Sequence, residues 1–164
     1  YLSQNKTQQI FNVVSAAFDF DTYLNDFQQE LNLQQVLFNK MVAGDTVFFK
    51  MWVDSLNQTS SKNQDLLIQQ RNDRNKAYAG IVLYSLTKDA FYKKSTLLPA
   101  YLNMYELIEP ENTEMLVFKA AFLADQGQCE KAKMIIDKAY KTGFSDKKRL
   151  YKMPEFSRCR SILF

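Results

Sequence analysis

Histidine is absent from this chain, and glycine and proline are scarce. The 164 residues include no His, four Gly and three Pro. The lack of histidine excludes histidine-based catalytic triads, histidine zinc sites and the usual proton shuttle of neutral pH. The four glycines never fall within one short segment, which argues against a glycine-rich phosphate loop. We therefore expect a protein that is not an enzyme and that has no cofactor and no metal.

Long apolar runs and alternating strand patterns are also missing. No segment reaches the roughly 18 to 20 apolar residues that a transmembrane helix requires, and no long stretch alternates valine or isoleucine with polar residues. What is present is a large supply of core material, because 46% of the residues are hydrophobic and 14% are aromatic. The sequence predicts an all-α chain with one sizeable core.

Apolar side chains recur at helical spacing in successive segments. We expect helices over 7–18, from a cap at Asp21 to near Gly44, from a cap at Asp45 to about 57, over 64–91, and from a cap at Ser95 or Thr96. Residues 57–63 are polar and predict a loop. The third of these helices is expected to bury Val47, Phe48, Met51, Trp52 and Leu56. The fourth is expected to place along one side Leu66, Leu67, Arg74, Ala77, Tyr78, Ile81, Tyr84 and Ser85.

Residues 110–143 form the clearest local pattern, which is that of a helical hairpin. Asn112 fits a helix cap, and Gly127 supplies the freedom of a tight turn. The second helix, from about Cys129 to Lys141, carries two small residues seven positions apart on one face, where another helix can approach closely. These two residues are Ala132 and Ala139.

This hairpin resembles one tetratricopeptide repeat, a unit of about 34 residues. The resemblance rests on the lead-in Pro110-Glu111-Asn112, the small residue at Ala120, the turn Gly127, and Ala132 and Ala139. It implies a right-handed superhelix of about seven to eight helices over a single domain, residues 1–164. Within it we expect divergent N-terminal helices (1–58), a degenerate helix pair (64–109), the best-matched repeat (110–143) and capping helices (144–164). The ending of the chain is similar to that of many bacterial members.

The resemblance implies a non-catalytic scaffold or adaptor that binds a protein or peptide segment in the concave face of the superhelix. In the matched repeat it places on that face Glu114, Val117, Ala121, Ala124 and Asp125. Val117 and Ala121 stand where carboxylate-binding members carry lysine and asparagine, so a more apolar groove is expected. Phe91 and Tyr92 extend this groove or pack in the core. A homo-oligomer is compatible with the same surface.

Positive charge is concentrated near the C-terminus. Residues 130–160 hold ten Lys and Arg against four Asp and Glu, whereas residues 1–42 hold two against four. The densest cluster comprises Lys147, Lys148, Arg149 and Lys152. Such a patch attracts acidic partners, nucleic acid or anionic membranes, but a solvated polar cap over the last repeat accounts for it more simply. We therefore expect no nucleic-acid binding.

The compartment is left open by the sequence, with export to the periplasm or cell envelope favoured over the cytoplasm. The first residue is Tyr1, which fits removal of an export signal or trimming of the chain. An alternative function is therefore an envelope structural or assembly factor, anchored through a segment ahead of Tyr1. For Cys129 we expect a buried free thiol, and a disulfide with Cys159 is the alternative.

Enzymatic alternatives depend on pairs of carboxylates. Asp19 with Asp21, Asp125 with Glu130, and Glu109 with Glu111 are candidates by sequence proximity, and the sequence does not show whether any pair meets in a cleft. Each pair also fits helix ends, where acidic side chains act as caps or favour the first turn. We prefer this simpler interpretation.

Overall fold

The computed structural model describes residues 20–62 and 66–164, and every regular element in these ranges is helical. The all-α prediction is confirmed for this part of the chain, and the helix expected over 7–18 lies outside it. The chain divides into two compact units, Tyr1–Val36 and Leu37–Phe164. Helix α2 (Phe20–Val42) begins ahead of Asp21. The cap predicted at that residue is therefore wrong, because its backbone is already helical.

Helix α3 (Thr46–Lys62) begins where the sequence predicts but runs further. The Asp45 carboxylate accepts a hydrogen bond from the Phe48 amide at 3.0 Å, which confirms the predicted cap. The loop expected over 57–63 is wrong for residues 57–62, which continue α3. A polar run does not by itself end a helix, because an exposed helix surface accommodates polar side chains as well as a loop does, as at Asn57 and Gln58, which are both exposed.

The buried faces of α3 and of α4 (Leu66–Lys93) differ from the expected ones. In α3, Val47 and Met51 are exposed, whereas Phe49 and Val53 are buried with the expected Trp52. In α4 the expected stripe is exposed at Leu66, Leu67 and Ile81. The residues that α4 does bury are Asn72, Asn75, Ala79, Gly80, Leu83, Thr87, Ala90 and Phe91. Both helices carry apolar residues on several sides, so the periodicity of the sequence alone does not determine which side faces the core.

Helix α5 (Leu98–Ile108) packs along α4 and also contacts α3. Pro99 lies in its first turn as predicted, but its N-cap residue is Leu97, which makes no capping side-chain bond. The Glu109 carboxylate, on the residue that follows α5, occupies the space where a Cβ at Gly80 would lie. The helix approach predicted at Gly80 stays a prediction, because the atoms at this position belong to a side chain and not to a helix backbone.

Helices α6 (Thr113–Asp125) and α7 (Cys129–Lys141) form the predicted hairpin. The Asn112 side chain accepts a hydrogen bond from the Met115 amide at 3.1 Å, as expected of a cap. Gly127 in the turn has a φ of +76°, a conformation that glycine adopts without strain. Ala132 and Ala139 are fully buried. The local predictions for this segment are confirmed.

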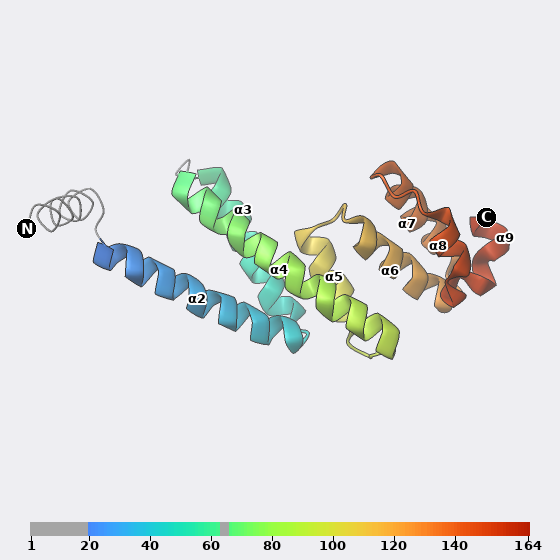
Figure 1. Ribbon diagram of the computed structural model, residues 1–164, viewed down its shortest axis with the longest axis horizontal. Helices are drawn as coiled ribbons and strands as arrows, with labels where there is room; N and C mark the ends of the chain where they lie inside the picture. The colour runs from blue at the N-terminus through green and yellow to red at the C-terminus, as the bar shows by residue number, and fades with distance from the viewer. Residues whose placement is uncertain (1–19, 63–65) are drawn as a thin grey trace, which may run out of the picture. The chain divides into compact units, whose positions relative to one another are not determined.

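The centre of the Leu37–Phe164 unit is α6, which contacts α4, α5, α7 and η1 (Pro154–Cys159). Figure 1 shows α6 and α7 together with the short C-terminal elements at one end of the unit. Because four elements surround α6, it is buried on more than one face.

The C-terminal cap consists of α8 (Lys147–Lys152), η1 and α9 (Arg160–Leu163). Phe156 anchors η1 in the core with no exposed surface. Cys159 of η1 forms a disulfide with Cys129 at the start of α7. The expectation of a free thiol at Cys129 is therefore wrong. The cause is the return of η1 onto α6, which brings the two Cα atoms to 5.2 Å, within the range of a disulfide.

Within residues 20–62 and 66–164, no helix combines the length and the apolar character that a membrane crossing requires.

A basic and aromatic groove as the candidate functional site

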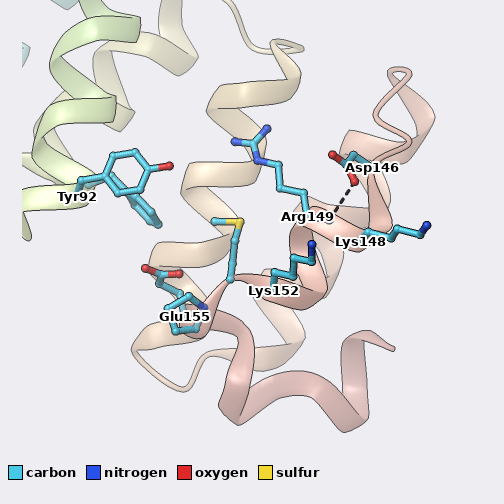
Figure 2. A pocket seen from close by; sticks show the side chains of 9 residues that line it. Tyr92, Asp146, Lys148, Arg149, Lys152 and Glu155 are labelled. Atoms are coloured by element: carbon cyan, nitrogen blue, oxygen red, sulfur yellow. Dashed lines mark hydrogen bonds between the residues drawn. The ribbon is translucent and has the colours of Figure 1, made fainter.

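A hollow of about 510 Å³ lies between the end of α4 and the cap. We call it the cap groove. Figure 2 shows Tyr92 on one side, Arg149 and Lys152 on the other, and Lys148 directed away from Tyr92. The residues that line it are Phe91, Tyr92, Asp146, Lys148, Arg149, Lys152, Met153, Pro154 and Glu155.

The aromatic side of the groove comes from the last turn of α4. Phe91 is buried and packs on Phe118 of α6, with ring centroids 5.0 Å apart. Tyr92 meets the edge of the Phe91 ring at 5.4 Å, but 67% of Tyr92 is exposed. A ring fixed on one side and open on the other offers a firm apolar surface to a ligand.

The charged side of the groove comes from α8. The Asp146 side chain caps this helix by accepting a hydrogen bond from the Arg149 amide at 2.9 Å. The Arg149 guanidinium forms a two-bond ion pair with the Glu114 carboxylate of α6, at 2.6 and 2.8 Å. The hydrogen bond to Glu114 raises the pKa of Arg149 above its ordinary value. Arg149 therefore holds the cap against α6 and is already engaged.

Lys148 and Lys152 differ from Arg149 because they are exposed and have no acidic partner among the described residues. They lie four positions apart and share one side of α8. Two carboxylates also line the groove: Asp146 is used as the helix cap, and Glu155 lies near Tyr92 in the view of Figure 2. The free positive charge of the groove is thus the lysine pair.

The residues predicted for the concave face do not form an open surface in this unit. Glu114 is half-buried in its ion pair, and Asp125 is exposed. Val117, Ala121 and Ala124 are fully buried. The packing around α6 explains this burial: η1 returns onto the helix, and the Cys159 sulfur lies 3.7 Å from the Ala124 carbonyl oxygen.

The four residues of the predicted basic patch do not act as one surface, because two of them contact other side chains. The Lys147 ammonium lies over the Tyr140 ring, 5.5 Å from its centroid. Arg149 is paired, which leaves Lys148 and Lys152 for a ligand. Sequence reasoning named Tyr92 but missed Met153, Pro154 and Glu155 as lining residues. Only their adjacency to the lysine cluster signals this role, because the sequence does not show that α4 ends opposite α8.

Acidic and sulfur side chains form no metal-binding cluster of three or more in the described ranges. No protein-family model, curated protein or solved structure matches this chain.

Proposed function

We propose that this chain is a non-catalytic scaffold or adaptor that holds a segment of a partner protein in the cap groove. The observation that carries the proposal is the lysine pair, Lys148 and Lys152, which lacks an acidic partner among the described residues and lines the same hollow as the exposed Tyr92. Aromatic residues are enriched in recognition surfaces, and unpaired positive charge attracts a partner of opposite sign. The helices that carry these residues hold them in position.

The side chains that line the groove are better placed to bind a ligand than to catalyse an acid-base reaction. Asp146 is engaged as a helix cap, and Figure 2 shows Glu155 at the other end of the groove. Catalysis by two carboxylates requires that both converge on one reacting centre. This separation favours binding over catalysis.

The helical hairpin also supports a tetratricopeptide-like architecture as part of the proposal. Its small buried residues, turn glycine and capped first helix are the features on which the resemblance rests. The proposed binding surface differs from the usual one of that family, because Val117, Ala121 and Ala124, which the resemblance places on the concave face, are fully buried. We therefore assign the partner segment to the cap groove, at the edge of the cap.

Photo-crosslinking tests this function directly. Tyr92 is replaced by the photoreactive p-benzoylphenylalanine, and the cells of origin or their extract supply the partner. Ile81, 69% exposed on the same helix, receives the same replacement as the control position. We expect a cross-linked protein from position 92 that is absent from position 81.

Charge reversal then ties the cross-link to the groove. The double change Lys148→Glu and Lys152→Glu is expected to abolish it. The matched change Lys131→Glu and Lys133→Glu, two exposed lysines of α7 outside the groove, is expected to preserve it. Equal cross-linking from positions 92 and 81, or equal loss in both charge variants, would overturn the proposal.

The disulfide favours a second candidate, an envelope structural or assembly factor. Structural disulfides persist mainly in oxidising compartments such as the periplasm and the extracellular space, and Cys129 and Cys159 are joined in this protein. Thiol labelling of protein isolated from its native host tests the assignment. An exported protein yields unlabelled cysteines until it is reduced, whereas labelling without reductant argues for the cytoplasm.

A further inference from the structure

A second hollow adjoins the cap groove and shares its two lysines. It has a volume of about 310 Å³ and is lined by Lys147, Lys148, Tyr151, Lys152 and Phe164. Tyr151 and Phe164 are 56% and 50% exposed, and their rings meet edge to face at 5.8 Å. Lys148 and Lys152 thus have an aromatic surface on either side: Tyr92 in the cap groove, and Tyr151 with Phe164 in the second hollow.

Charges of both signs line the cap groove. Asp146 and Glu155 line the same groove as Lys148 and Lys152. A continuous polyanion, such as nucleic acid or an anionic bilayer, would bring negative charge to these carboxylates as well as to the lysines. A peptide can place its carboxylates only where the lysines stand and present apolar side chains elsewhere. The pattern therefore favours an acidic peptide.

The lysine spacing fits an extended segment. Residues four apart on a helix have Cβ atoms about 5 to 6 Å apart. In an extended chain, residues two apart share one face at about 6.6 to 6.8 Å. Two acidic residues separated by one position in an extended segment come close to the spacing of Lys148 and Lys152, and so do two acidic residues four apart in a helical segment. In the extended segment, the residues two positions beyond the acidic pair in each direction share the same face, so large apolar side chains there are directed to the aromatic surfaces on either side, where they gain most from burial.

We propose, building on the proposed function, that the partner segment is an extended acidic peptide. Its two carboxylates lie two residues apart and pair with Lys148 and Lys152, and large apolar residues on both sides contact Tyr92 and the Tyr151–Phe164 pair.

Fluorescence anisotropy with synthetic peptides tests this partner class. The probe is a labelled peptide reading Gly-Phe-Ser-Asp-Ser-Asp-Ser-Leu-Gly, in which Phe, both Asp and Leu share one face of the extended chain, titrated with the 164-residue chain at low salt. We expect binding that weakens about tenfold in a Lys148→Gln and Lys152→Gln variant, the effect of losing two exposed ion pairs. The Lys131→Gln and Lys133→Gln variant, with the same charge change on α7, is expected to bind within twofold of the unmodified protein.

Three further probes separate the alternatives. A peptide with Asn in place of both Asp residues should lose about tenfold as well, and one with the Asp residues adjacent should bind more weakly than the original. A peptide with the Asp residues four apart tests a helical ligand. Equal binding of the Asn peptide, or tighter binding of the four-apart peptide, would overturn the proposal.

Polyanions provide the last comparison. A single-stranded oligonucleotide and vesicles with anionic lipids are titrated under the same conditions, and both are expected to bind more weakly than the acidic peptide. Tighter binding of either would replace the peptide by that polyanion. If charge reversal abolishes the position-92 cross-link but no acidic peptide binds, the proposed function stands and this inference fails. If position 92 gives no specific cross-link, the proposed function fails by itself.

Discussion

Helices α4 and α6 both contribute to the core of the Leu37–Phe164 unit, but they contribute differently. α6 buries seven of its 13 residues, all of them apolar. α4 buries eight of its 28, and three of these are Asn72, Asn75 and Thr87. The difference follows from their neighbours, because α6 is contacted by four elements whereas α4 packs mainly along α5 and α6. The side chains that α6 buries are all apolar and its charged Glu114 stays half-buried in an ion pair, whereas α4 buries polar side chains as well.

The two helices also differ in how their neighbours are held. The elements around α6 are held together by the Cys129–Cys159 disulfide and by the Arg149–Glu114 ion pair. The contact of α4 with α5 depends on packing, and the Glu109 side chain lies against Gly80. We therefore expect covalent and polar changes to act mainly on the α6 side, and changes in packing to act on both.

Removal of the disulfide is expected to have the largest effect. The two cysteines are 30 residues apart, and closure of a loop of this length lowers the entropy of the unfolded chain enough to stabilise the fold by about 3 to 4 kcal/mol. A Cys129→Ser and Cys159→Ser variant should lose this amount in urea denaturation. The single variant Cys159→Ser should match it, and a loss below 1 kcal/mol would show that packing alone holds the cap.

A matched pair of truncations on α4 tests which of its faces is the core. Leu83 has no exposed surface, whereas Ile81 is 69% exposed. Leu83→Ala should therefore cost about 3 kcal/mol through lost burial and the cavity it leaves. Ile81→Ala should lie within about 0.5 kcal/mol of the unmodified protein. Chemical denaturation of both variants checks the assignment, and the reverse order would restore the face predicted by sequence.

The success of sequence reasoning follows the same division. In the hairpin, the cap residue Asn112, the turn Gly127 and the buried Ala132 and Ala139 were all identified, because each has a local physical signature. In α4 the expected Ile81 is exposed and Leu83 is buried. Apolar residues on several sides of that helix make its orientation depend on α5 and α6, which are distant in sequence.

The candidate site was only partly predictable for a related reason. The lysine cluster and Tyr92 are visible in the sequence, but they are more than 50 positions apart and meet through the packing of α4 and the cap. Burial of Val117 and Ala121 depends on the packing of α6 in the centre of the unit. The Cys129–Cys159 pairing depends on the return of η1 in the same way. Such tertiary contacts leave no periodic signal.

Loss of the hairpin cap should have a moderate effect. The Asn112 side-chain Oδ1 accepts a hydrogen bond from the Met115 backbone amide, and the side-chain Nδ2 donates to the Glu109 carboxylate at 2.6 Å. Asn112→Ala removes both bonds and should cost about 1 to 2 kcal/mol in thermal or urea unfolding. Asn112→Ser, which retains a capping oxygen, should recover most of the loss. If Asn112→Ser is as unstable as Asn112→Ala, the bond to Glu109 matters more than the cap.

Removing a polar group from the buried face of α4 is expected to stabilise the protein. Thr87 has no exposed surface, and its hydroxyl has no hydrogen-bond partner among the described residues. Thr87→Val keeps the shape and removes the unsatisfied group, so it should stabilise the protein by about 1 kcal/mol. Differential scanning calorimetry should show a higher Tm. A lower Tm would indicate that the hydroxyl is hydrogen-bonded in solution.

The smallest expected effect is a loss of stability at low pH, which distinguishes the Asp45 cap of α3 from the Asn112 cap of α6. Hydrogen bonds from the Phe48 amide and then from Lys40 hold the pKa of Asp45 below its ordinary value of 3.8. The lowered folded-state pKa means that this carboxylate stabilises the fold above its unfolded pKa, and that the contribution is lost as the pH falls through the folded one. Asn112 does not titrate. Urea midpoints measured between roughly pH 6 and pH 2 should therefore fall more steeply for the unmodified protein than for Asp45→Asn, which keeps a capping oxygen. Parallel curves would show that the carboxylate adds nothing that a neutral cap does not provide.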